Sequence, residues 1–307
     1  MSAPLIGMNI QFSDSDNLLD IRYDNVFKAV FTKNTPASQG ALSNLISALI
    51  ERKVTVASLT TNEPPIDDLR DRCIRFDIAC KTENGELINI EMSLNPDSCE
   101  LPRIEYYAGK LFTRQEIKGG GKNYANLKEA YQITILANGR FLRDEALIHT
   151  FEYYDPLHKV SLNGKSRIIT VELIKAEQII KKPVGEIAAR EAWAAFFRYL
   201  TDREKREKIN EILLREEGIA MAGEVLINIS QDEIEWARQL SREKYINDYE
   251  SDMSIAWDRG MEKGLEKGHK EKALEIAKNL KACGVPIKTI SQSTGLSPEE
   301  ISSLGSE

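Results

Sequence analysis

Two acidic residues, Asp77 and Glu91, stand in two short segments whose side chains alternate between apolar and polar. Such alternation is typical of strands with one buried face, so residues 74–80 and 88–94 are predicted to be β-strands. The residues between them at 83–86, Glu-Asn-Gly-Glu, are typical of a hairpin turn. The two carboxylates are therefore expected on neighbouring antiparallel strands.

The length of the turn decides whether these carboxylates face each other. A two-residue turn would pair Asp77 with Met92 and put Glu91 on the opposite face. A three-residue turn with Gly85 in the left-handed region pairs Asp77 with Glu91. It also places the apolar pairs on one face: Ile78 with Ile90, Cys80 with Ile88, and Phe76 with Met92. A slip of one residue would move every side chain to the wrong face, so burial favours the three-residue turn.

Facing carboxylates on such a hairpin have their Cβ atoms about 5 Å apart. Two like charges this close repel unless a proton or a cation lies between them. Magnesium takes one or two protein carboxylates and keeps waters for phosphate oxygens. It can polarise a phosphodiester and lower the pKa of an attacking water. The pair thus predicts metal-dependent phosphodiester hydrolysis; the alternative is an exposed polar strand face with unrelated acidic residues.

The surrounding elements suggest an α/β fold with a mixed sheet. Apolar spacing predicts two helices within residues 24–52, divided at Asn34-Thr35-Pro36, and a further helix at 102–118. Additional strands are predicted at 54–59, 131–137 and 167–174. From residue 185 onward the pattern is almost continuously helical. We expect a flexible arm (1–19), a nuclease-like core (20–183), a helical region (184–268) and a small helical tail (269–307).

The tail has the pattern of a helix-turn-helix, with residues 287–291, a turn at Thr294-Gly295, and residues 298–304. Ser297 and Glu300 form the sequence signature of a capping box. A recognition helix normally offers basic or amide side chains, whereas this one offers Glu299 and Glu300. We therefore favour a protein-contact role for the tail, with DNA contact by the preceding helix as the alternative.

The composition narrows the function classes. The 307-residue chain is 42% hydrophobic and 29% charged, and it has no apolar run long enough to span a bilayer. Its first residues lack the pattern of a secretory signal, so a cytoplasmic location is expected. The net charge of −7 argues against general attraction to nucleic acid. Residues 101–143, however, hold eight Lys or Arg against three Glu, a local net charge of +5 that suits a phosphate backbone; an incidentally charged helix face is the alternative.

Several motifs, in order along the chain, resemble those of the Rpn-type recombination-promoting nucleases, which are also described as putative transposases of the PD-(D/E)xK family. Residues 24–31, Asp-Asn-Val-Phe-Lys-Ala-Val-Phe, resemble their D-x-x-F-K-x-x-F opening. Residues 75–78 and 90–93 resemble their R-x-D-I and I-E-x-Q elements. The family's R-x-x-Y-Y … G-x-x-Y region is similar to Arg103 with Tyr106-Tyr107, followed by Gly121 and Tyr124. Its E-L-x-K strand is similar to residues 172–175. Its C-terminal tail is similar to the glycine-spaced helix and the T-G-L-S segment of this chain. The resemblance covers residues 20–304.

This resemblance implies a restriction-endonuclease-like core, in which helices flank a mixed sheet, followed by a helical C-terminal region. It implies a DNA endonuclease dependent on Mg²⁺ or Mn²⁺, linked to recombination or transposition. The metal ligands carry over to Asp77 and Glu91, with Asp24 as a further acidic contact. DNA is the implied partner, no membrane is expected, and a homodimer is expected because double-strand cutting often uses two subunits.

One departure concerns residue 93. The superfamily has a lysine two residues after the glutamate and the Rpn-type members usually have glutamine, whereas this chain has Ser93. We count Ser93 with Asp77 and Glu91 as catalytic, because its hydroxyl can orient a metal-bound water, but it supplies no positive charge. Lys81 or Lys110 can replace that charge, and Lys81, Arg103, Tyr106 and Lys110 are the expected substrate contacts; surface lysines and a packing tyrosine are the alternatives. A catalytically weakened DNA- or protein-binding descendant remains the alternative function.

Overall fold

The computed structural model describes residues 10–61, 75–115, 123–232, 237, 240–242, 261, 264–265 and 267–304. The chain divides into two compact units, residues 1–239 and 240–307. Most of residues 231–268, within the almost continuously helical pattern predicted from residue 185 onward, lie outside the described residues.

The first unit holds a six-stranded sheet, a two-stranded hairpin and helices on both faces of the larger sheet. Its elements are α1 (Asp24–Thr32), α2 (Pro36–Leu49), β1 (Val56–Leu59), β2 (Ile78–Thr82), β3 (Leu87–Ser93), α3 (Glu100–Thr113), the 3₁₀ turn η1 (Tyr124–Asn126), β4 (Ala130–Leu136), β5 (Ile148–Phe151), β6 (Tyr154–Asp155), β7 (Val160–Ser161), β8 (Ser166–Glu172), η2 (Leu173–Ala176), α4 (Glu177–Ile180), η3 (Val184–Glu186), α5 (Ala189–Tyr199), η4 (Arg203–Lys205), α6 (Arg206–Arg215) and α7 (Glu217–Ser230).

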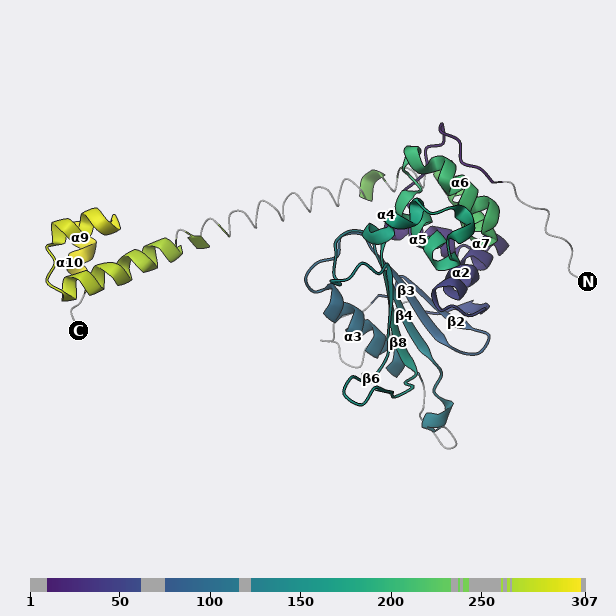
Figure 1. Ribbon diagram of the computed structural model, residues 1–307, viewed down its shortest axis with the longest axis horizontal. Helices are drawn as coiled ribbons and strands as arrows, with labels where there is room; N and C mark the ends of the chain where they lie inside the picture. Colours follow the sequence, from purple (N-terminus) through teal and green to yellow (C-terminus); the bar gives the residue numbers. More distant parts are fainter. Residues whose placement is uncertain are drawn as a thin grey trace, which may run out of the picture. The chain divides into compact units, whose positions relative to one another are not determined.

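The six strands are ordered β1-β2-β3-β4-β8-β5. Strands β3, β4 and β8 run parallel to one another, and the other three neighbouring pairs are antiparallel. Helix α3 covers one face of the sheet, where it contacts β3, β4 and β8, and helices including α2 and α5 lie on the other side (Figure 1). The predicted mixed α/β sheet flanked by helices is therefore confirmed.

One large hydrophobic core joins the sheet to the helices opposite α3. Helix α1 contributes Val26, Phe27, Val30 and Phe31, whose helical spacing puts all four on one buried stripe. Helix α2 begins where Thr35 accepts a hydrogen bond from the Ser38 amide, which explains the division at Asn34-Thr35-Pro36. Trp193 and Phe197 of α5 pack against Phe31 of α1.

The helices after residue 184 belong to this same core. Side chains of α5, α6 and α7 are buried together with those of α1, α2 and the sheet. We expected a boundary at residue 183, between the nuclease-like core and a helical region. Instead, the first compact unit continues through residue 239, because the sheet face opposite α3 needs these helices to cover it.

The N-terminal segment is also packed where it is described. Phe12 and Leu19 are buried, the Phe12 amide donates to Asn210 Oδ1 at 2.8 Å, and the Leu19 amide donates to Ser230 Oγ at 3.0 Å. A flexible arm over residues 1–19 is therefore wrong for residues 10–19, whose apolar side chains close the core beside α6 and α7. Residues 1–9 lie outside the described residues.

The hairpin of β2 and β3 has the register expected from its apolar pattern. Ile78 pairs with Ile90 and Cys80 pairs with Ile88. The turn places Gly85 at a φ of 84°, and the Thr82 amide donates to the Glu86 carbonyl at 3.0 Å, which closes a three-residue loop. The left-handed conformation explains why glycine stands at this position.

The start of β2 differs from the prediction. The strand begins at Ile78, and Asp77 lies in a bend before it. Phe76 is buried with Ala79 and Leu111 beneath α3, with its ring 5.7 Å from that of Tyr107, whereas Met92 lies in the large core. The expected placement of Phe76 and Met92 on one face is therefore wrong, because the alternation of a strand does not extend through a bend.

The second unit contains a helix over residues 267–282, α9 (Ile287–Thr294) and α10 (Pro298–Ser303). Its small core consists of Ala277, Ile290, Leu296 and Ile301. Gly295, at a φ of 72°, ends α9. Ser297 and Glu300 form the predicted capping box at the start of α10. The Lys281 ammonium group donates to the carbonyl oxygens of Ile301 and Ser302 at 3.0 and 2.9 Å, so it stabilises the carboxyl end of α10.

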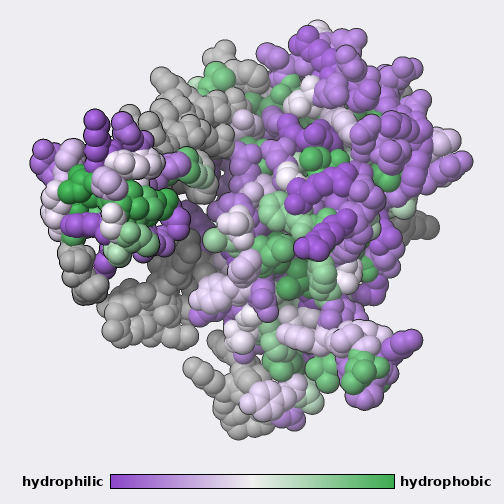
Figure 2. Space-filling model, turned by 60° about the vertical axis from the view of Figure 1, so that its left-hand side comes forward, coloured by the Kyte–Doolittle hydropathy of each residue, from purple (hydrophilic) through white to green (hydrophobic). Residues whose placement is uncertain are grey.

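Hydrophilic side chains cover most of the face of the chain seen in Figure 2. Among the helices that the structure describes, none is long and apolar enough to cross a membrane.

Candidate active site

Asp77 and Glu91 are held together by hydrogen bonds that cross between their two segments. The Asp77 amide donates to Glu91 Oε1 at 3.1 Å, and the Met92 amide donates to Asp77 Oδ2 at 3.1 Å. Each carboxylate thus binds the backbone of the segment that carries the other. Glu91 is only 7% exposed. The hairpin register therefore delivers two acidic side chains to one almost buried place.

The surroundings of this pair oppose its negative charge. Burial, and then the negative charge of Asp77, raise the pKa of Glu91 well above its ordinary value. Burial is also the main cause that raises the pKa of Asp77, with a further contribution from the charge of Asp24 and an opposing one from Lys28. Both side chains would gain from a cation placed between them.

Helix α1 brings Asp24 and Lys28 to the same place. The Lys28 Nζ atom lies 2.6 Å from Asp24 Oδ1 and 2.9 Å from Asp77 Oδ1, so one ammonium group joins the two aspartates. Burial lowers the pKa of Lys28, but the charge of Asp77 and the bonds to both carboxylates outweigh it, and the net shift is upward. Sequence reasoning missed Lys28, although it stands inside the quoted motif at residues 24–31. The signal was its spacing of four residues from Asp24, which puts both on one side of a helix.

A second group of polar side chains lies beside the pair, formed by Ser93 at the end of β3 and by Glu100 and Arg103 in the first turn of α3. The Ser93 hydroxyl donates to Glu100 Oε2 at 3.1 Å, and Arg103 donates to Glu100 Oε1 at 2.8 Å and to Ser93 Oγ at 3.4 Å. Burial lowers the pKa of Arg103, but the bond to Glu100 and the charge of Glu91 raise it. Arg103 therefore lies within the electrostatic reach of Glu91. Glu100, which is buried, was not among the predicted site residues.

Beneath α3 the sheet carries polar side chains that orient Glu91. The Asn89 side-chain amide donates to Glu91 Oε1 at 2.8 Å and to Gln132 Oε1 at 2.9 Å. Gln132 in turn donates to Thr134 Oγ1 at 3.2 Å. These residues are buried on neighbouring parallel strands. A buried chain of this kind fixes the rotamer of the carboxylate at its end.

Three of the predicted substrate contacts lie away from the pair. Lys81 is four residues along β2 from Asp77, which is about 13 Å in a strand, and its side chain lies beside Gly85 in the turn. Lys110 lies over the exposed ring of Tyr106, with Nζ 5.8 Å from the ring centroid. The structure thus brings Asp24, Asp77, Glu91, Ser93 and Arg103 together, and leaves Lys81, Tyr106 and Lys110 outside the cluster.

The donor set is suited to a hard divalent cation. Asp77 and Glu91 offer carboxylate oxygens in a setting that disfavours bare negative charge, and such oxygens are the ligands that Mg²⁺ and Mn²⁺ prefer. Asp24, expected as a third ligand, contacts Lys28. Within the described residues, no three His, Cys, Asp or Glu side chains gather in an arrangement that could hold a metal ion. Asp77 and Glu91 are accordingly the two residues that would hold it.

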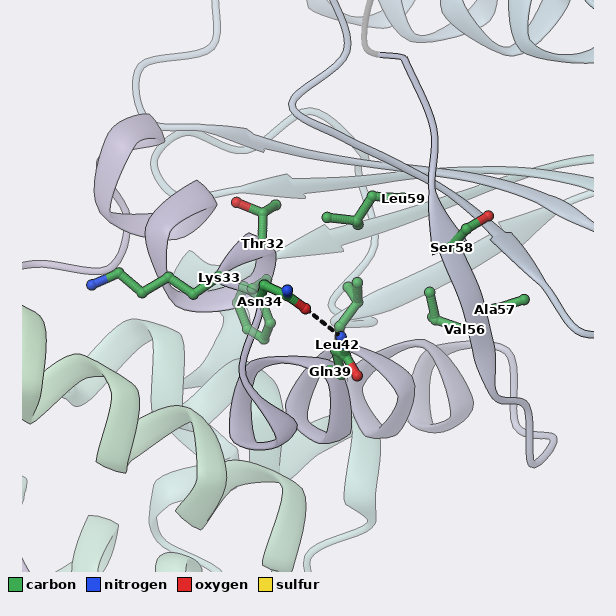
Figure 3. A pocket seen from close by; sticks show the side chains of 10 residues that line it. Thr32, Lys33, Asn34, Gln39, Leu42, Val56, Ala57, Ser58 and Leu59 are labelled. Carbon is green, nitrogen blue, oxygen red and sulfur yellow. Dashed lines mark hydrogen bonds between the residues drawn. The ribbon is translucent and has the colours of Figure 1, made fainter.

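A separate cleft of about 250 Å³ lies at the edge of the sheet (Figure 3). Lys33 and Asn34, which follow α1, line it together with Gln39 of α2 and Leu59 of the edge strand β1. The Gln39 side-chain amide donates to Asn34 Oδ1 at 3.2 Å across its rim. None of the acidic residues of the cluster lines this cleft.

The mixed sheet flanked by helices, with an Asp–Glu hairpin, fits a PD-(D/E)XK, restriction-endonuclease-like fold. The family model described as "PD-(D/E)XK nuclease family transposase" matches residues 21–256. The model described as "Rpn/YhgA-like nuclease family, C-terminal HTH domain" matches residues 270–306. The chain belongs to the PD-(D/E)XK nuclease family of transposases, with an Rpn-type helix-turn-helix at its C-terminal end. No curated protein and no solved structure matches it.

Proposed function

We propose that this protein is a divalent-metal-dependent DNA endonuclease that acts in recombination or transposition. The observation that carries the proposal is the pair Asp77 and Glu91, which the hairpin holds together almost out of solvent. Membership of a nuclease family of transposases supports the reaction class. The helix-turn-helix match supports DNA as the partner. Homodimer formation and a cytoplasmic location stay predictions from the sequence.

Each residue of the cluster has a distinct part in the proposed mechanism. Asp77 and Glu91 would hold Mg²⁺ or Mn²⁺, and the bound ion supplies Lewis-acid stabilisation of the phosphate and a lower pKa for the attacking water. Asn89 fixes the orientation of Glu91. The Ser93 oxygen accepts a hydrogen bond from Arg103, and the Ser93 hydroxyl donates to Glu100, so Ser93 joins these two residues of α3 to the end of β3. Arg103 presents a guanidinium beside Ser93, where it can bind a phosphate oxygen of the substrate.

The first prediction concerns Asp77→Asn. This change keeps the size of the side chain and an acceptor for the Met92 amide but removes the charge that binds the ion. We expect cleavage of plasmid and linear DNA with Mn²⁺ or Mg²⁺ to fall at least about 100-fold, because metal catalysis contributes several kcal/mol to the stabilisation of the transition state. Rates of nicking across a metal series measure the effect.

The matched control is Asp155→Asn, since Asp155 is an exposed aspartate of β6 that pairs with His158 away from the cluster. It should cleave at the rate of the unchanged protein. Cleavage by Asp77→Asn at that same rate would reject the assignment of the site.

The second candidate function is a catalytically weakened descendant that binds DNA or protein. It is favoured by Ser93, which replaces the usual Lys or Gln and hydrogen-bonds to Glu100. In that case the unchanged protein would bind DNA equally well with and without EDTA, and it would show no cleavage with either metal. The cleavage assay described above separates the two functions.

A further inference from the structure

Lys28 lies inside the motif at residues 24–31, but neither this motif nor the family match assigns a role to it. Its ammonium group lies within 2.9 Å of a carboxylate oxygen of both Asp24 and Asp77. It reaches them from helix α1, whose opposite side is buried through Phe27 and Phe31. The Lys28 side chain is 26% exposed, so its ammonium group is accessible from solvent although helix α1 is packed into the core.

Residue 93, where the superfamily has its lysine, supplies no positive charge to the active site of this chain. Residue 93 is serine, and its hydroxyl is bound to Glu100. Arg103 lies nearby and can bind a phosphate oxygen, but its two hydrogen bonds at 2.8 and 3.0 Å are made to Glu100 of α3. Lys28, by contrast, contacts Asp77 itself.

We propose that Lys28 supplies the fixed positive charge of the active site in place of the lysine that residue 93 lacks. This inference rests on the proposed nuclease function. In the resting protein the ammonium group holds Asp24 and Asp77 together. With substrate present, it contacts an oxygen of the phosphate that is cleaved.

A count of charges shows why the site needs this lysine. Asp24, Asp77 and Glu91 together carry −3 when ionised, and Lys28 reduces this to −2. A divalent ion then makes the site neutral, so that a phosphodiester anion can enter without repulsion. Without Lys28 the loaded site would carry −1 and would repel the substrate. The loss of Lys28 would also make the carboxylates bind the metal ion more tightly, because no positive charge would oppose it.

Removal of the charge should therefore move metal binding and cleavage in opposite directions. The test compares Lys28→Met in the full chain with the unchanged protein. Calorimetry with Mn²⁺ alone, at pH 8.5 where protons compete least for the carboxylates, should give at least about tenfold tighter binding. Cleavage at saturating Mn²⁺ should fall about 100-fold or more, as for other lost electrostatic contacts to a transition state.

The matched control is Lys181→Met. Lys181 pairs with Glu177 at 2.7 Å with the same four-residue spacing as Lys28 and Asp24, but on the surface beside α4. This variant should leave both measurements unchanged. It corrects for the loss of one lysine from a helical ion pair.

Several outcomes would overturn the proposal. A folded Lys28→Met that binds Mn²⁺ as the unchanged protein does, or more weakly, would show that Lys28 only attaches α1 to the hairpin. If Lys28→Met does not fold, Lys28→Gln tests the same loss of charge, because a glutamine side chain is polar and can still donate a hydrogen bond to a carboxylate. Failure of the unchanged protein to cleave DNA would reject the proposed function itself. Equal cleavage by the unchanged protein and Lys28→Met would reject only the role of Lys28.

Discussion

Glu91 experiences both of the effects that oppose a carboxylate's charge, since it is buried and lies beside Asp77. Its pKa in the folded protein is well above the ordinary value. The folded state therefore binds a proton more tightly than the unfolded state does. Below the ordinary pKa of about 4.3 both states are protonated and the penalty is absent. As the pH rises through the folded-state pKa, the folded protein must ionise against these opposing effects and loses stability.

Glu91→Gln should consequently stabilise the metal-free protein. Glutamine keeps an oxygen to accept from Asp77 and Asn89 but has no charge. We expect the midpoint of thermal unfolding in EDTA to rise by a few degrees at pH 8, which is on the order of 1 kcal/mol, and to rise less at pH 5. Calorimetric or circular dichroism melting at both pH values measures this difference.

Glu145→Gln provides the comparison for this prediction. Glu145 is exposed, and its hydrogen bond with Arg140 lowers its pKa. Its replacement should bring no gain at pH 8. An equal rise for Glu91→Gln at both pH values would mean that packing, and not charge, is the cause.

The site residues differ in how far the sequence could reveal them. Asp77 and Glu91 could be paired because the apolar residues of both strands fix the register. Lys28 comes from a helix 49 residues before Asp77, and only the tertiary packing of α1 on the hairpin brings it there. Lys81 was predicted near the site because it was expected on the same strand face as Asp77, although a separation of four residues in a strand already implies about 13 Å.

At the level of elements, the hairpin turn determines whether the two carboxylates meet. Gly85 adopts a left-handed conformation, and a Cβ atom there would meet only ordinary contacts, the nearest being Lys128 Cε at 3.4 Å. The cost of a side chain at this position is therefore in the backbone. The destabilisation expected for a Gly85 variant therefore comes from backbone strain and not from crowding by neighbouring side chains.

Gly85→Ala should lower the free energy of unfolding by about 1–2 kcal/mol, the cost of a left-handed alanine. Gly85→Asn should cost less, because asparagine tolerates this region. Both should keep the register and hence metal-dependent cleavage. Chemical denaturation of the two variants checks the order, and an asparagine variant that is as unstable as the alanine one would contradict the explanation.

The helices and long strands were predictable because each has a clear period over one buried face. The short strands β5, β6 and β7 were not predicted, since segments of two to four residues carry too little pattern. Phe76 was assigned to the wrong face because a bend at Asp77 interrupts the alternation. Bends of this kind follow from tertiary contacts, and local sequence does not encode them.

At the scale of the molecule, each unit has its own hydrophobic core. The first core includes α5–α7, which sequence periodicity alone could not assign to the sheet rather than to a separate bundle. The second is small and centred on Ile290 and Ile301. In it, Glu300 accepts from the Ser297 amide at 3.0 Å, so the carboxylate is used for capping. The Lys270 ammonium group lies 3.5 Å from Glu300 Oε1 and balances part of the negative charge of one of the two acidic groups that argued against DNA contact.

Lys288→Glu tests whether this second unit binds DNA. Lys288 is exposed on α9, the helix that precedes the turn. If it contacts a phosphate, the affinity for DNA should fall for all sequences, and the slope of log affinity against log salt should decrease by about 1. Fluorescence anisotropy in EDTA at several salt concentrations gives both values. An unchanged affinity would favour the protein-contact role expected from the sequence.

The buried acidic pair also affects the cellular abundance expected for inactive variants of the protein. If the proposed function holds, loss of the charge of Glu91 would stop the reaction and at the same time stabilise the folded, metal-free chain. Chaperones and proteases remove chains that unfold, so variants that lack this charge would accumulate to higher levels than the unchanged protein. On the proposed function, selection for cleavage would be what keeps Glu91 in place, and relaxed selection would yield well-folded inactive copies.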